Sequence, residues 1–189
     1  MDNIADSIQE TAEQAGKNMI NSRVALFVAI TATFMALCNV KDGNIVQAMS
    51  QAQAHSIDAW SYFQAKSTKQ AVIQSSLDLL KHRNVQGDEA LINKYEEQIS
   101  RYEKEKTEIK AQAEGFQKEY DDTNLFDDQF DMTDALLTIS IAMLGITSLT
   151  QKKWLLYFSA MVSLVGIVLG VAAFLKISIH SDFISKILG

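Results

Sequence analysis

The sequence predicts an all-α integral membrane protein, with three transmembrane helices and a long antiparallel coiled-coil helical hairpin between the first and the second. Three observations predict this class. Three stretches are apolar and free of charge, the segment between the first two shows a seven-residue repeat, and residues 44–84 contain neither proline nor glycine. Apolar stretches of about 20 residues can cross a bilayer as helices, and the repeat is typical of helices that pack along a seam.

The apolar stretches predict transmembrane helices over residues 23–40, 135–151 and 154–175. No Asp, Glu, Lys, Arg or His occurs in their cores, Val24–Val40, Ala135–Thr150 and Trp154–Leu175. The first is at the short end of the lengths that span a bilayer, and the second needs its flanking residues. The alternative is a set of buried helices in a soluble protein. It is disfavoured because the hairpin leaves no polar shell that could cover three such helices.

The charges follow the same division. Residues 1–23 carry a net charge of −2, residues 41–134 of −7 and residues 135–189 of +3, within a total of −6. An exposed region as acidic as 41–134 repels the phosphate backbone, so nucleic-acid binding is not expected.

Residues 41–134 are expected to form an extramembrane helical hairpin, with arms at 44–84 and 88–122 and a turn at 85–87. In each arm one stripe of positions follows steps of three and four, which predicts coiled-coil packing. The first stripe is Ile45, Met49, Ala52, Ser56, Ala59, Phe63, Lys66, Gln70, Ile73, Leu77 and Leu80. The second is Ile92, Tyr95, Ile99, Tyr102, Lys106, Ile109, Ala113, Phe116 and Tyr120.

The residues around the turn suit the ends of two helices. Lys81, His82 and Arg83 place positive charge at the end of the first arm, where it favours the helix dipole. Gly87 can adopt backbone angles that a turn requires, and Asp88 is a candidate N-cap for the second arm.

The two ends of the chain are expected to lie at the membrane surface. Residues 1–22 separate apolar from acidic positions, which predicts an amphipathic N-terminal helix that contacts protein rather than anionic lipid. Residues 176–189 predict a short interfacial C-terminal tail.

Small residues recur at steps of three and four in each predicted span. Because small residues let helix backbones approach closely in lipid, the stripes predict helix packing within the chain and between chains. They are Ala25, Ala29, Ala32, Ala36 and Asn39; Ala135, Thr138, Ala142 and Gly145; and Ser159, Ser163, Gly166, Gly170 and Ala173. Gly166 and Gly170 form a GxxxG step.

A segment of the first arm carries a family resemblance. It matches the pattern W-x-Y-x-Q-A-K-x-x-K after a first span, with Trp60, Tyr62, Gln64, Ala65, Lys66 and Lys69. In this motif, and in its order of span, hairpin and two spans, the chain resembles the bacterial membrane-protein family called domain of unknown function 4337. The resemblance covers most of the chain. It implies a bacterial inner-membrane location and no particular activity.

These motif residues and Phe63 are a candidate interaction site. Two interpretations remain open. In the first, Trp60 and Phe63 fill the hairpin core while the lysines are solvated. In the second, Trp60 and Tyr62 are aromatic anchors, and Lys66 and Lys69 are charge partners, for another subunit or a lipid headgroup.

No sequence pattern predicts catalysis, a metal centre or a cofactor. Phosphate-binding loops, nucleophile elbows, zinc-binding helix motifs and dinucleotide fingerprints do not occur, and the three histidines are far apart. Six aspartates between residues 121 and 134 leave calcium binding open, although the spacing of an EF-hand is missing.

We therefore expect a structural or accessory protein that forms a homo-oligomer in membrane lipid, through the small-residue stripes of its spans and through its coiled-coil stalk, and that can join another membrane complex. An enzyme is not expected, because the sequence offers no nucleophile, metal or acid-base constellation. The alternative is a homo-oligomeric channel or pore lined by Thr31, Thr33, Asn39, Thr138 and Ser140.

The bases near the span ends predict the orientation, because such bases favour the cytoplasmic side. One side would hold Lys17, Arg23, Lys152 and Lys153, and the other Lys41, Lys176 and Lys186. The N-terminus is therefore expected in the cytoplasm and the hairpin in the periplasm.

Overall fold

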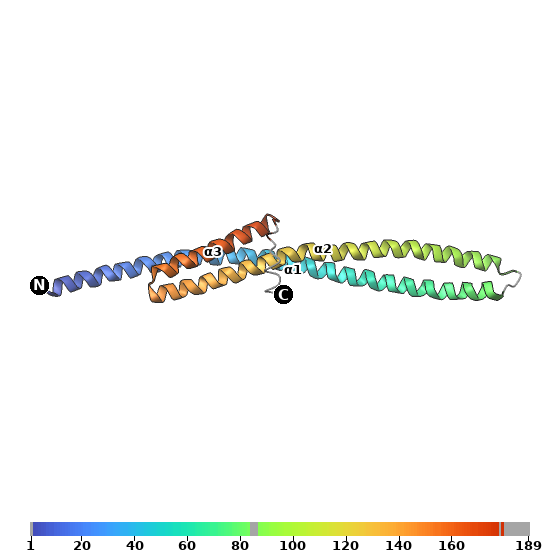
Figure 1. Cartoon of the computed structure of the whole chain (residues 1–189), viewed down its shortest axis with the longest axis horizontal. Coiled ribbons are helices and arrows are strands. Elements are labelled where there is room, and N and C mark those ends of the chain that lie inside the picture. Colours follow the sequence, from blue (N-terminus) through green and yellow to red (C-terminus); the bar gives the residue numbers. More distant parts are fainter. Residues whose placement is uncertain (1, 84–86, 178, 180–189) are drawn as a thin grey trace. The chain divides into compact units, whose positions relative to one another are not determined.

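The computed structural model is all-helical and describes residues 2–83, 87–177 and 179. Helix α1 spans Asp2–Arg83, helix α2 spans Glu89–Thr150 and helix α3 spans Lys153–Phe174 (Figure 1). The chain divides into two compact units. Residues 1–46 and 124–189 form the apolar unit, and residues 47–123 form the hairpin unit. Both α1 and α2 contribute residues to each unit.

Helix α1 joins segments that the sequence analysis treats separately, namely the N-terminal helix 1–22, the span 23–40 and the first hairpin arm. The physical reason is that nothing in this stretch ends a helix. The chain has no proline, and α1 contains only Gly16 and Gly43. A helical glycine costs about 1 kcal/mol relative to alanine, which a long helix that packs over most of its length from Ile20 onward tolerates.

Parts of the predicted ends lie outside the described residues. The structure describes no side chain for residues 1–8, 11 and 12, so the amphipathic face of segment 1–22 is described only in part. Of the predicted tail 176–189, only residues 176, 177 and 179 are described, and of the turn 85–87 only Gly87.

In the hairpin unit, α1 and α2 pack against each other along the two predicted stripes (Figure 1). Every stripe position within residues 47–123 is buried or half-buried. The buried ones are Met49, Ala52, Ser56 and Leu77 on α1 and Ile109 and Ala113 on α2. The Ser56 hydroxyl donates a hydrogen bond to the carbonyl of Ala113 at 3.4 Å, so small residues bring the two backbones close together at this level.

The turn has the expected chemistry. Gly87 has a φ of +109°, in the region that favours glycine. The carbonyl of Asp88 accepts hydrogen bonds from the backbone N–H groups of Leu91 and Ile92 at 3.1 and 2.9 Å, so Asp88 occupies the N-cap position of α2.

The apolar unit packs all three helices around two small cores. One core contains Ile20, Val24, Leu144 and Leu156, and the other contains Cys38, Phe130 and Ala173. Hydroxyl groups add bonds between helices, as where Thr31 and Ser163 lie 2.9 Å apart. Within the described residues, three helices are long and apolar enough to cross a membrane.

Burial in both units follows one seven-residue register on each long helix. On α1 the buried or half-buried positions include Val24, Thr31, Cys38, Ile45, Ala52 and Ala59. On α2 they include Ile109, Phe116, Thr123, Phe130, Leu137 and Leu144. A repeat of seven residues keeps one side of a helix turned toward a packed neighbour. The stripe that the sequence shows in the hairpin therefore extends into the predicted spans.

Candidate functional site

Lys66, the first of the two motif lysines, is held between α1 and α2 by three side chains. Its ammonium nitrogen lies 2.5 Å from Glu105 Oε2 and 5.1 and 5.2 Å from the ring centroids of Tyr62 and Tyr102. Only 14% of the Lys66 side chain is exposed. A charge in a half-buried position needs compensation, and here a carboxylate and the faces of two aromatic rings provide it.

The charge of Lys106, the polar residue in the stripe of the second arm, is also compensated by an aromatic ring and an oxygen atom. Lys106 of α2 lies 5.3 Å from the ring centroid of Phe63 and donates a hydrogen bond to Gln70 Oε1 at 3.1 Å. The Trp60 ring packs edge-on against Phe63, with 5.6 Å between ring centroids. The polar breaks at Lys66, Gln70 and Lys106 therefore belong to one layer that joins the two helices. The residue pattern of either arm alone does not indicate this layer, because its contacts join the two helices.

The contact between Lys66 and Glu105 keeps both groups ionised. Its hydrogen bond lowers the pKa of Glu105 and raises the pKa of Lys66. A lysine that stays protonated is neither a base nor a nucleophile. The layer therefore joins α1 to α2 through an ion pair.

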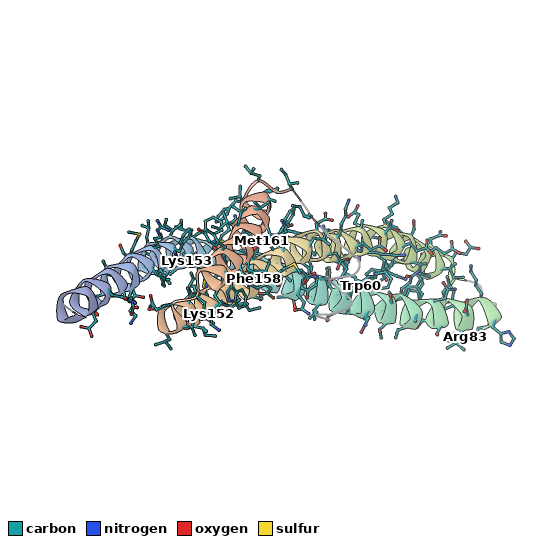
Figure 2. All side chains as sticks on the ribbon, turned by 60° about the vertical axis from the view of Figure 1, so that its left-hand side comes forward. Trp60, Arg83, Lys152, Lys153, Phe158 and Met161 are labelled. Atoms are coloured by element: carbon teal, nitrogen blue, oxygen red, sulfur yellow. The ribbon has the colours of Figure 1, made fainter. Side chains whose placement is uncertain are left out.

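The motif residues divide between the two sides of α1. Phe63 and Lys66 occupy the seam and are half-buried. Trp60, which is labelled in Figure 2, is also half-buried. The exposed members are Tyr62, Gln64, Ala65 and Lys69. Tyr62 is 53% exposed although it contacts Lys66. Recognition of a partner by this exposed side stays a prediction.

The small residues of α3 pack inside the chain. Ser159, Ser163, Gly166, Gly170 and Ala173 are buried. A Cβ at Gly166 would lie 2.9 Å from Leu137 Cδ2, and one at Gly170 would lie 2.8 Å from Phe34 Cε1 and 2.9 Å from Thr133 Cγ2. The GxxxG step thus brings α3 close to α1 and α2 of the same chain.

The small residues of α1 and α2 lie on exposed faces. Ala25, Ala29, Ala32 and Ala36 on α1 and Ala135, Thr138, Ala142 and Gly145 on α2 are all exposed. The seven-residue register contains part of the inward-facing positions, such as Thr31 and Cys38 on α1 and Leu137 and Leu144 on α2. Thr133, Ser140 and Thr147 of α2 are also buried and lie outside that register.

Carboxyl groups occupy register positions in the apolar unit. Asp42 on α1 and Asp127 on α2 lie near enough for each carboxyl group to affect the pKa of the other. One oxygen of each is shielded from water and has no hydrogen-bond partner among the described residues. Burial, together with Asp131 and the partner carboxyl, raises the pKa of Asp127 to about 6, and burial also raises the pKa of Asp42.

No metal site is associated with these acids in the described part of the chain. There, no three His, Cys, Asp or Glu side chains are arranged to hold a metal ion. The described residues therefore provide no group of ligands for the calcium binding that the aspartates of residues 121–134 left open.

The polar span residues that would line a pore do not share one face. Thr31 and Ser140 are buried, and the Ser140 hydroxyl donates to the carbonyl of Ser159 at 2.9 Å. Thr33 donates to the carbonyl of Ala29 in its own helix at 2.8 Å. Asn39 and Thr138 are exposed.

These features define an all-helical chain with an apolar three-helix unit and a polar hairpin unit. The chain belongs to the family described as domain of unknown function (DUF4337), whose model matches residues 20–176. The match includes all of α2 and α3 and the contact between Lys66 and Glu105. No curated protein and no solved structure matches the chain.

Proposed function

We propose that this chain is a structural or accessory protein of the bacterial inner membrane, which α1, α2 and α3 cross through residues 23–40, 135–151 and 154–175. The outer surface of the apolar unit supports this proposal. Large apolar side chains there are more than half exposed, among them Leu26, Leu37, Ile139, Leu164 and Val168. A surface of this kind needs lipid or another protein to cover it.

The proposed role is architectural and not enzymatic. The buried polar groups support it, because they join helices to one another. Thr31 forms a hydrogen bond with Ser163, and Ser140 forms one with the carbonyl of Ser159 on α3. Lys66 forms a salt bridge with Glu105. Each of these groups is already engaged inside the chain.

The proposed assembly is a homo-oligomer formed through the small residues of α1 and α2. The observation that carries this proposal is that both stripes are exposed whereas the stripe of α3 is buried. The two stripes also lie on neighbouring faces, because Met35 Sδ, beside Ala36, lies 4.0 Å from Thr138 Oγ1. Together they offer a surface of low relief on which a helix of a second copy can approach closely.

Enlarging two residues of this surface tests the assembly. Ala32→Leu with Ala142→Leu should reduce the mass of the detergent-solubilised complex to that of a monomer, because the side chains hold the helices of two copies apart. The matched control is Val165→Leu, which enlarges an exposed residue of α3. Mass photometry measures the particle mass, and circular dichroism verifies an unchanged helix content. A monomeric wild-type chain, or a complex that both changes leave intact, would refute the proposal.

The proposed orientation has the N-terminus in the cytoplasm and the hairpin in the periplasm. It is supported by the bases Lys17, Arg23, Lys152 and Lys153, which lie near span ends on one side. The hairpin unit is then available to a partner in the periplasm, such as another membrane complex.

A further inference from the structure

One end of the apolar unit carries four exposed bases near the turn between α2 and α3. They are Lys17 and Arg23 on α1 and Lys152 and Lys153 at the turn, of which the last two are labelled in Figure 2. The turn is tight, because Gln151 has a φ of 55°, Lys152 is extended and α3 begins at Lys153. Both turn lysines are therefore fixed at the end of the unit.

Asn21 holds α1 beside this turn. Its Oδ1 accepts hydrogen bonds from Ser148 Oγ at 3.1 Å and from Gln151 Nε2 at 2.8 Å. Arg23 follows Asn21 closely in sequence, and Lys17 precedes it by about one helical turn. The contact thus gathers bases from separate parts of the chain at one end.

The positive charge at this end is not neutralised by the described residues. None of the four bases forms an ion pair with a described residue. Residues 14–41 and 135–181 contain no Asp or Glu. The described acid nearest in sequence is Glu13, one helical turn before Lys17, and its side chain is exposed. The other end of the unit has the opposite character, because the acids Asp42, Asp127, Asp128, Asp131 and Asp134 lie there and outnumber the described bases Lys41 and Lys176.

Aromatic side chains lie next to these bases. Trp154 is 62% exposed and Tyr157 is 67% exposed, both in the first turns of α3. Tryptophan and tyrosine favour the boundary between hydrocarbon and headgroups, and lysine and arginine extend their charges into the same layer. In a bilayer that α3 crosses, this end therefore lies at headgroup depth.

We propose that this basic end, formed by Lys17, Arg23, Lys152 and Lys153 with Trp154 and Tyr157, binds the headgroups of anionic phospholipids. The proposal rests on the proposed crossing of the membrane. Each base near an anionic surface strengthens binding by about fivefold. The acidic end has the opposite preference, so anionic lipid collects at one end of the apolar unit only.

Trp154 reports which lipid lies beside the basic end. In a Trp60→Phe background it is the only tryptophan. The full chain is reconstituted into bilayers of equal parts phosphatidylcholine and phosphatidylglycerol, with bromine on the acyl chains of one lipid or the other. Bromine quenches a nearby indole, so the ratio of the two quenching efficiencies measures lipid preference. We expect a severalfold preference for phosphatidylglycerol, which about 1 M salt should abolish by screening.

Two variants locate the preference. Lys152→Gln with Lys153→Gln should lower the ratio clearly toward one, although Lys17 and Arg23 keep their charges, while quenching by brominated phosphatidylcholine persists. As the matched control, Leu175→Trp in a chain with Trp60→Phe and Trp154→Phe places the reporter at the acidic end, where the ratio should be one or lower. Leu175 is 66% exposed, so the larger ring has room.

Each other result is decisive. Equal quenching of Trp154 by both lipids overturns the lipid preference but leaves the crossing of the membrane intact. A ratio unchanged by the lysine substitutions, or the same preference at position 175, also overturns it. If neither lipid quenches Trp154, α3 does not lie in the bilayer, and both the proposed crossing and this inference fail.

Discussion

A methyl group added at Gly170 would overlap with side chains from both other helices of the apolar unit. Its Cβ would lie 2.8 Å from Phe34 Cε1 on α1 and 2.9 Å from Thr133 Cγ2 on α2. Favourable contacts between carbon atoms begin at about 3.5 Å. The Phe34 ring has little freedom to move away, because it also packs edge-on against Phe174, with 6.4 Å between ring centroids.

Gly170→Ala should therefore destabilise the chain. Overpacking of this kind costs about 1–3 kcal/mol, and the higher helix propensity of alanine returns about 0.5–1 kcal/mol. The net loss is about 0–2.5 kcal/mol with a midpoint near 1 kcal/mol, and for a chain of this size that midpoint lowers Tm by roughly 2–4 °C. Gly166→Ala should cost less, because the Leu137 Cδ2 atom, 2.9 Å from its Cβ, is the end of a flexible side chain.

The control is Gly145→Ala, because no atom lies within 4 Å of its added Cβ. Its Tm should equal or slightly exceed that of the wild type. The assay is thermal unfolding in one mild detergent, followed by circular dichroism at one scan rate. Equal Tm values for Gly170→Ala and Gly145→Ala would show that α3 does not approach α1 and α2 as closely as described, and the packing argument would fail.

Three further predictions concern charge and orientation. Because the pKa of Asp127 is raised to about 6, its contribution to stability is present below pH 3.8 and is lost as pH rises through 6. Asp127→Asn should remove most of this loss of stability at high pH, because asparagine does not ionise. An Asp127→Asn variant that is no more stable than the wild type at pH 7 would contradict the prediction. Glu105, whose pKa Lys66 lowers, stabilises the hairpin above its ordinary pKa. Glu105→Gln should therefore lower the urea concentration at the midpoint of hairpin unfolding at pH 7, as followed by Trp60 fluorescence. In strong acid the substitution should leave this midpoint unchanged. A cysteine at exposed Lys94 in a Cys38→Ala chain should react with impermeant maleimide from the periplasm, and labelling only after the inner membrane is broken would invert the proposed orientation.

The sequence alone determined the helices and the seam of the hairpin unit. Steps of three and four between apolar residues are a local property, and they identify the packed side of a helix when the other side is polar. Each residue assigned to the stripes within residues 47–123 is buried or half-buried. The positive φ of Gly87 and the capping position of Asp88 follow in the same way from local backbone requirements.

Tertiary structure decided which faces of the apolar unit turn inward and which charges meet. In a span every side is apolar, so hydrophobic periodicity does not mark the packed face, and small residues indicate only where a neighbour can approach. Each of the three small-residue stripes was a candidate for the packed face of its helix. The stripe that contains Gly166 and Gly170 is buried, while those that contain Ala29 and Ala142 are exposed. Likewise, the sequence shows Lys66 only as a break in a stripe. The opposing helix supplies Glu105, because the register between two helices depends on packing along their whole length.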